Sequence, residues 1–332
     1  VTSTTAATPT PTTTPTPTST PIPNSVGYTA TAYNVYKVNL LTNSTESVVS
    51  GIGLGENPLY LALDRPRGYL YAVLNTLTGG IWRMSTTTNT SVGPQLGGIF
   101  FTPYTNLTIK PDNTKAYFAR TLNSNPGKIG IIDLDTFTID GYINLPYTAS
   151  DTPWHTAITP DGSRLYVSSN GGAAGAYGLY AIDTATNTVT ASINIGPITG
   201  RGLCASHDGT KIYVVVDGQG AYVVDTQTNV ATAIVPTLGT QLYSIAINGD
   251  DSMLYITDIW QGKLYTVRTS DYTLINTLVI GLSALGSRPG QITLNSDYSK
   301  AYIGVSFGVN GSGIGTTTVV NLTDYSTGSI YY

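Results

Sequence analysis

The sequence predicts an all-β fold: a propeller of seven radially arranged blades with an extended Thr/Pro-rich tail at its N-terminus. Val, Ile, Tyr and Thr dominate the segments between polar turns, and no helical periodicity interrupts them. A tyrosine just after such a turn recurs about every 42 to 49 residues, which is the length of one four-stranded blade. These tyrosines are Tyr71, Tyr117, Tyr166, Tyr213, Tyr255 and Tyr302.

The N-terminal tail, residues 1–24, consists almost wholly of Thr, Pro, Ser and Ala. Proline fixes φ and removes amide donors, so this segment favours an extended polyproline II conformation. Its hydroxyls fit an O-glycosylated stalk, and a disordered linker is the alternative. Such a composition cannot bury enough apolar area to order itself. We therefore expect any order in the tail to come from a neighbouring subunit or from attached sugar.

The propeller, residues 25–332, is predicted to begin with an incomplete blade. Residues 26–30 supply one strand and Tyr33–Val49 an outer hairpin, but no innermost strand precedes them. Six inner hairpins follow, at Leu59–Val73, Thr105–Ala119, Trp154–Val167, Arg201–Val214, Tyr243–Ile256 and Gly290–Ile303. Seven outer hairpins lie near Tyr36, Trp82, Ile129, Tyr180, Tyr222, Leu264 and Thr318. Seven blades therefore fit best, and six blades with an added hairpin is the alternative.

The best-formed blade runs from His155 to Ile195. The turn at residues 160–163 joins its inner strand, 155–159, to a second strand at 164–168. The third and fourth strands are predicted at 177–184 and 188–195, joined by a polar turn with Asx and Ser/Thr chemistry. Asp161-Gly162 is a pair typical of hairpin turns.

The motifs of this blade carry a family resemblance. Pro160-Asp161-Gly162 before Leu165-Tyr166-Val167, and then residues 182–189 (Ile-Asp-Thr-Ala-Thr-Asn-Thr-Val), resemble the YVTN repeat of seven-bladed surface propellers. Residues 128–232 carry most of the resemblance, which does not extend to the tail. That family is best known from archaeal surface-layer and bacterial cell-surface proteins, so the resemblance implies an extracellular location. Sugar-lactone hydrolases share a similar repeat.

Composition narrows the classes of function. Only 10% of the residues are charged, the net charge is −4, and no basic patch with interleaved aromatic residues is present, which disfavours nucleic-acid binding. A lone cysteine, Cys204, forms no intrachain disulfide and fits a small buried position. No apolar run is long enough to cross a membrane. A start at Val1 is typical of a mature chain whose signal peptide has been removed.

Candidate ligand-binding residues lie where the inner strands begin, at the expected mouth of the central channel. Aligning the repeats on their tyrosines brings together Tyr60, Trp154, His155, Arg201, Tyr243 and Gln291. A ring of this kind could bind a sugar by stacking and hydrogen bonding, and a water-filled polar lining is the alternative. The aligned positions hold no carboxylate, so we expect neither a metal site nor a catalytic site, and no cofactor. The second histidine, His207, is expected in an exposed turn.

Asn-x-Ser/Thr sequons predict glycosylation sites on the rim and in loops. We expect Asn43, Asn89, Asn310 and Asn321 to be modified, because turns and loops admit a bulky glycan. Asn106 falls on an inner strand, where a glycan would not fit.

These features together predict an extracellular, non-enzymatic, glycosylated structural subunit of a cell-surface filament, sheath or surface layer. Its partners would be copies of itself, joined through the N-terminal tail or the Tyr-rich C-terminal strand. A stalked adhesin or carbohydrate-binding propeller is the alternative, and a lactonase-like hydrolase is the third possibility.

Overall fold

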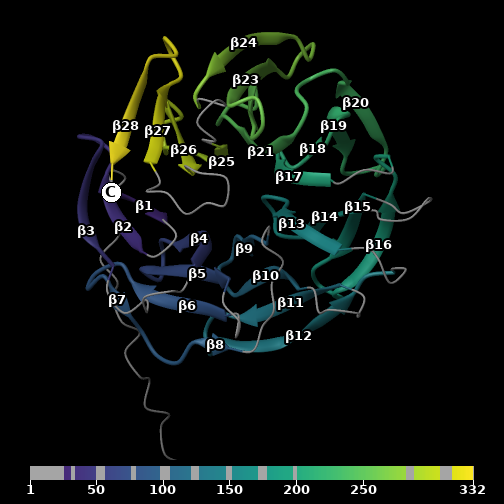
Figure 1. Cartoon of the computed structure of the whole chain (residues 1–332). Helices are drawn as coiled ribbons and strands as arrows, with labels where there is room; N and C mark the ends of the chain where they lie inside the picture. Colours follow the sequence, from purple (N-terminus) through teal and green to yellow (C-terminus); the bar gives the residue numbers. More distant parts are fainter. Residues whose placement is uncertain are drawn as a thin grey trace, which may run out of the picture.

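Seven antiparallel sheets arranged around a central axis make up the computed structural model of this chain (Figure 1). It describes residues 26–30, 34–49, 57–75, 80–97, 105–120, 127–146, 152–170, 178–196, 200–281, 288–306 and 316–331. Within these ranges there is no helix. The all-β class and the seven-bladed propeller predicted from the repeats are confirmed, and six blades with an added hairpin is wrong.

The first three sheets show the most variation. The first has three strands, β1 (Val26–Ala30), β2 (Val35–Asn39) and β3 (Ser44–Val48). The second has β4 (Asn57–Asp64), β5 (Tyr69–Asn75) and β6 (Gly80–Ser85), whose outer edge pairs with two short strands, β7 (Thr90–Ser91) and β8 (Leu96–Gly97). The third has β9 (Leu107–Ile109), β10 (Lys115–Arg120), β11 (Lys128–Asp133) and β12 (Thr138–Asn144).

Each of the remaining four sheets has four strands in chain order from the axis outward. The fourth has β13 (Thr152–Ile158), β14 (Arg164–Asn170), β15 (Leu179–Asp183) and β16 (Thr188–Ile193). The fifth has β17 (Gly200–Ala205), β18 (Lys211–Val216), β19 (Gly220–Asp225) and β20 (Ala231–Val235). The sixth has β21 (Leu242–Ile247), β22 (Met253–Asp258), β23 (Lys263–Arg268) and β24 (Leu274–Val279). The seventh has β25 (Arg288–Leu294), β26 (Lys300–Ser306), β27 (Thr316–Asn321) and β28 (Thr327–Tyr331).

The repeated tyrosines occupy equivalent places in the second strand of each sheet. Tyr166 pairs with Ala157 on the inner strand, and the corresponding partner of Tyr213 is Cys204. The fully buried Tyr166 reaches the outer turn of the neighbouring fifth sheet, where its hydroxyl donates to Asn229 Oδ1 at 3.1 Å. Burial raises the pKa of the Cys204 thiol, as expected for a small packed residue rather than a reactive one.

Tyr28 on β1 is a seventh member of the tyrosine series, which the sequence analysis did not identify. Val26 pairs with Asn39 in the first sheet as Arg164 pairs with Asp183 in the fourth, which makes Tyr28 the equivalent of Tyr166. Its hydroxyl lies 3.5 Å from Asn89 Oδ1 in the outer turn of the second sheet. The same contact between neighbouring sheets therefore begins in the incomplete blade.

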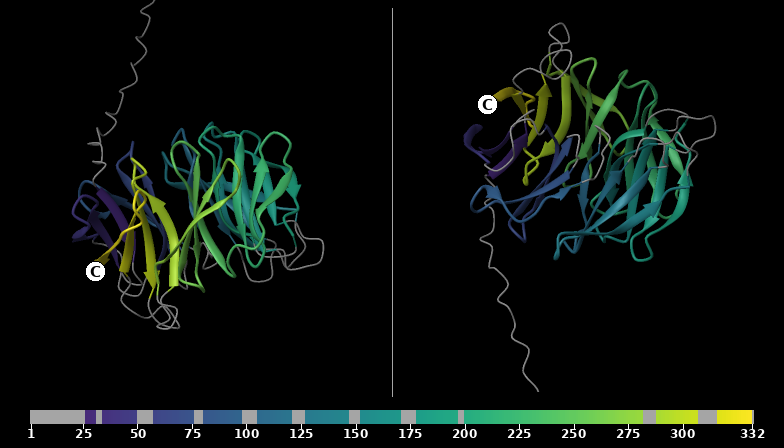
Figure 2. Two further views of the ribbon diagram at one scale, coloured as in Figure 1. Left: turned by 90° about the horizontal axis from the view of Figure 1, so that it is seen from above. Right: turned by 60° about the horizontal axis from the view of Figure 1, so that its bottom comes forward.

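The core consists of apolar clusters, each packed between two neighbouring sheets. The cluster between the third and fourth sheets holds ten buried residues, among them Tyr117, Leu165 and Ile182. The last and first sheets close the ring through a smaller cluster of three buried residues, Val38, Val319 and Ile330. There β28 lies against β3, and Thr45 Oγ1 donates to the Tyr331 carbonyl oxygen at 3.0 Å. Figure 2 shows this closing seam, where purple strands meet yellow ones.

The described part of the first sheet matches the predicted incomplete blade. Its innermost strand is β1, a second strand by its equivalence to β14, and in the described residues no strand pairs with its axial edge. The seventh sheet already has four strands of its own, so in the described part of the chain the ring closes by packing between sheets and not by a shared strand.

Candidate functional site

The predicted channel-mouth residues all lie on inner strands. Tyr60 is on β4, and Trp154 and His155 are on β13. The other three lie on later inner strands: Arg201 on β17, Tyr243 on β21 and Gln291 on β25. Four sheets, from the fourth to the seventh, bring five of these side chains into mutual contact. Tyr60 is the exception, because its phenol hydrogen-bonds Asn106 and burial raises its pKa.

Arg201 is the centre of this cluster. Its guanidinium carbon lies 4.7 Å from the ring centroid of Trp154 and 5.9 Å from that of Tyr243, both within cation–π range. Its Nε and Nη2 atoms lie 2.7 and 2.6 Å from Asp217 Oδ2. With the Arg201 residue only 7% exposed, the guanidinium is held on two sides by rings and at its edge by a carboxylate.

Asp217 corrects the expectation that the channel mouth holds no carboxylate. It follows β18, the second strand of its sheet, so an alignment of inner-strand positions could not find it. Its Oδ2 is taken up by Arg201, and its buried Oδ1 has no hydrogen-bond partner among the described residues. The carboxylate therefore neutralises a buried cation, the arrangement that burial of an arginine requires.

His155 lies beside this ion pair and is 3% exposed. Burial, with a smaller contribution from the Arg201 charge, lowers the pKa of His155 to about 3, so the imidazole is neutral at physiological pH. Gln291 Nε2 lies 3.0 Å from His155 Nε2. Because Ser244 Oγ donates to Gln291 Oε1 at 2.9 Å, the Gln291 amide nitrogen is oriented to donate to the ring. Gln291 thus bridges Ser244 of the sixth sheet to His155 of the fourth.

The contacts that these groups already make limit the chemistry open to them. A histidine with a pKa near 3 is a weak base, and Arg201 is engaged on three sides. The indole of Trp154 has Arg201 over its ring and the residue is 8% exposed, so that face cannot stack on a sugar. Within the described ranges, no group of three His, Cys, Asp or Glu residues is placed to hold a metal ion.

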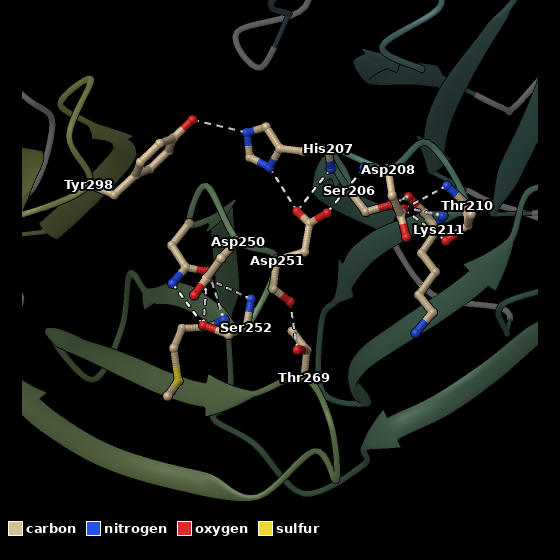
Figure 3. Close-up of polar contacts among 12 residues, drawn as sticks. Ser206, His207, Asp208, Thr210, Lys211, Asp250, Asp251, Ser252, Thr269 and Tyr298 are labelled. Atoms are coloured by element: carbon tan, nitrogen blue, oxygen red, sulfur yellow. Dashed lines mark hydrogen bonds and ion pairs between the residues drawn. The ribbon is translucent and has the colours of Figure 1, made fainter.

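A second polar cluster lies in the turns that follow β17, β21 and β25, at the opposite ends of these inner strands. Figure 3 shows its contacts. His207, in the predicted turn, contacts Asp251 Oδ1 through Nδ1 at 2.7 Å, and its Nε2 lies 3.0 Å from the Tyr298 hydroxyl. Asp251 and Tyr298 both have φ near +58°, the left-handed position that Gly162 fills in the fourth sheet (φ values 58°, 57° and 71°). Gly249 is required beneath the Tyr298 ring, since a Cβ there would lie 2.3 Å from it. The cluster ties together the turns of three consecutive sheets.

The sequons have structural roles where they are described. Asn43 and Asn89 have left-handed φ values of 53° and 54° in outer turns, and Asn321 Oδ1 accepts a bond from the Thr323 amide. Asn106 is 7% exposed and clamps Thr156 of the next sheet, accepting from its amide at 2.8 Å and donating to its carbonyl at 2.7 Å. Asn310 lies outside the described residues. Glycosylation of the four predicted sites stays a prediction.

No protein-family model and no curated protein matches this chain. A solved structure of Kuenenia stuttgartiensis hydrazine synthase aligns over 89% of this chain and 90% of that chain, with a TM-score of 0.69 and 16% identity. The Cps50 (Swd1) β-propeller domain of Myceliophteria thermophila covers 90% of this chain and 94% of its own, with a TM-score of 0.65 and 14% identity. At these identities the likeness shows the fold alone, a seven-bladed β-propeller.

Proposed function

We propose that this chain is an extracellular structural subunit of a cell-surface filament, sheath or surface layer, similar to the YVTN-repeat surface propellers. It associates with copies of itself through its N-terminal tail or its C-terminal strand, β28. The observation that carries the proposal is the three-stranded first sheet, whose axial edge at β1 has no strand partner in the described part of the chain. An open strand edge is a site for association, because its backbone groups accept a further strand.

The outer edges of the propeller support the same proposal. Strands at a free edge usually carry charges that prevent pairing, but four of the outermost strands here, β16, β20, β24 and β28, contain no charged residue. Val279 on β24 and Tyr331 on β28 are 62% and 74% exposed. Such edges are suited to packing against a neighbouring subunit.

The channel mouth supports a non-enzymatic role. Arg201 is paired with Asp217 and Gln291 with His155, and the histidine is neutral and buried. Tyr243, which is half-buried, favours the carbohydrate-binding alternative, and Asp217 favours the hydrolase. Saturable glycan binding that Tyr243→Ala abolishes would support the former. Lactone hydrolysis that Asp217→Asn abolishes, in a variant still folded, would support the latter.

Truncation tests the structural proposal directly. We expect the full chain to form polymers that electron microscopy and sedimentation detect. A variant lacking residues 1–24 should give the same circular dichroism and remain monomeric. If the truncated propeller polymerises like the full chain, the tail is not the association element. If the full chain is monomeric at every concentration, the structural function itself is wrong.

A further inference from the structure

The prolines of the tail follow a two-residue period that polyproline structure does not require. All six, at positions 9, 11, 15, 17, 21 and 23, are odd-numbered. Every even position from 8 to 22 holds Thr, except 22, which holds Ile. In an extended strand the N–H and C=O groups of alternate residues point to opposite edges. A strand formed by this segment would have one edge without most of its donors and one edge with all of them.

A one-sided strand of this kind has a matching place in the fold. Proline is tolerated in a sheet only where its nitrogen faces away from the ladder, at an edge strand. The inner strand of a blade is such an edge strand, because it pairs only with the second strand. In the described residues six sheets have an inner strand, β4, β9, β13, β17, β21 and β25, and the first has none.

We propose that the even-numbered residues of the tail, from Thr16 to Ile22, pair with the axial edge of β1 and supply the missing inner strand. This inference rests on the proposed function and names the site of the self-association. By equivalence with Arg164 and Tyr166, the residues of β1 that point to the axial edge are Val26, Tyr28 and Ala30. Three residues on β1 then meet the donor-bearing edge of the tail, while the prolines face the channel.

The hairpin geometry favours the tail of a second copy over the chain's own tail. In five sheets the carbonyl of the first residue of the second strand accepts a hydrogen bond from the amide of the residue five positions earlier. These bonds run from Lys110 to Lys115, Thr159 to Arg164, Ser206 to Lys211, Asn248 to Met253 and Asn295 to Lys300. The same count back from Val26 reaches Pro21, which has no N–H. The repeat's own turn would thus direct Pro21 and Pro17 toward β1. A tail from another copy can choose the register that directs the threonines there.

This contact is heterologous, since a tail on one subunit meets a strand edge on the next. Such a contact repeats from subunit to subunit unless its rotation closes a ring. Each subunit would donate one tail and accept one tail. The result is a polymer whose joints are strand pairs with few apolar anchors, of which Ile22 is one.

Proline substitutions of opposite parity test the pairing. A labelled peptide of residues 8–23 is titrated into the propeller of residues 25–332, and binding is followed by fluorescence anisotropy. We expect saturable binding that changes less than three-fold with Ser19→Pro and weakens at least ten-fold with Thr18→Pro or Thr20→Pro. Equal effects of the two parities, or no binding of the peptide, would overturn the pairing.

The same substitutions in the full chain separate this inference from the proposed function. Polymers should persist in the Ser19→Pro variant and be lost in the Thr20→Pro variant, with unchanged circular dichroism in both. If polymers need the tail but the Ser19→Pro and Thr20→Pro variants behave alike, the proposed function stands and the strand pairing is wrong. If the full chain is a monomer whose β1 amides are protected in a parity-dependent way, its own tail fills the edge, and both the second-copy assignment and the self-association are wrong.

Discussion

Two seams of the ring differ in how much they bury, although both join neighbouring sheets. Between the third and fourth sheets, ten buried residues pack into one cluster. Between the seventh and first, the buried cluster of described residues has three members, with half-buried Tyr36, Leu40 and Tyr302 around it. In the described residues no strand is shared across the closing seam, so contacts made by side chains resist its opening. The repeat supplies an apolar cluster at every seam between neighbouring sheets. At the closing seam, however, the stability of the packing depends on the incomplete first blade.

A substitution at the seam between the third and fourth sheets should cause the largest loss of stability. Leu165→Ala removes a fully buried side chain from the ten-residue cluster and should lower the free energy of unfolding by about 3–5 kcal/mol. Chemical denaturation measures it. A loss below about 1 kcal/mol would mean that this seam is loosely packed.

The second effect concerns pH: acid should destabilise the protein through His155 of the fourth sheet. The pKa of His155 is about 3 when folded and 6.5 as the ordinary value, so the unfolded chain binds a proton first as pH falls. The stability that neutral His155 allows is complete above pH 6.5 and is lost as pH falls toward 3, at about 1.4 kcal/mol per pH unit. His155→Gln should flatten this part of the stability–pH curve. An unchanged curve would contradict the buried, neutral imidazole.

The closing seam should open locally. Ile330→Ala removes a side chain that is 1% exposed from the three-residue cluster, and we expect a loss of about 2 kcal/mol. Hydrogen exchange should rise first in β1, β2, β3 and β28, while β13 and β14 stay protected. Uniform acceleration across all seven sheets would show that the closing seam is no weaker than the others.

The smallest effects are expected from two tyrosine hydroxyls, one at the closing seam and one at the seam between the fourth and fifth sheets. Tyr302 donates to the Leu40 carbonyl across the closing seam at 3.3 Å, and Tyr166 donates to Asn229 at 3.1 Å. Each Tyr→Phe substitution should cost about 1 kcal/mol of unfolding free energy. A Tyr302→Phe variant as stable as the parent chain, beside a destabilised Tyr166→Phe, would mean that the closing bond contributes nothing.

The sequence predicted much of the fold because the repeat is local. Turn residues such as Asp161-Gly162 and the alternating strands around Tyr166 fix each hairpin by short-range chemistry, and all six predicted inner hairpins are present. The repeat pattern did not predict Tyr28 as a member of the tyrosine series, because no turn and inner strand of the repeat precede it in the first blade. Its role depends on Asn89, which is 61 residues away.

The candidate site was predicted only in part, because its contacts cross between sheets. An alignment of repeats placed Trp154, Arg201 and Tyr243 correctly on successive inner strands. It could not show that Asp217 reaches back from the end of a second strand, nor that Gln291 bridges to His155, 136 residues earlier. The link from His207 to Asp251 and Tyr298 arises in the same way from three turns that only the closed ring brings together.

Hydrogen exchange at β1 tests the central claim most directly. The amides of Val26, Tyr28 and Ala30 point to the axial edge, whereas those of Gly27 and Thr29 point to β2 and serve as internal controls. In assembled full-length protein we expect all five amides to be protected. In the 25–332 propeller and in the Thr20→Pro chain, the three axial amides should exchange at least ten-fold faster while the controls stay slow. Equal protection of the axial amides with and without a competent tail would contradict the account.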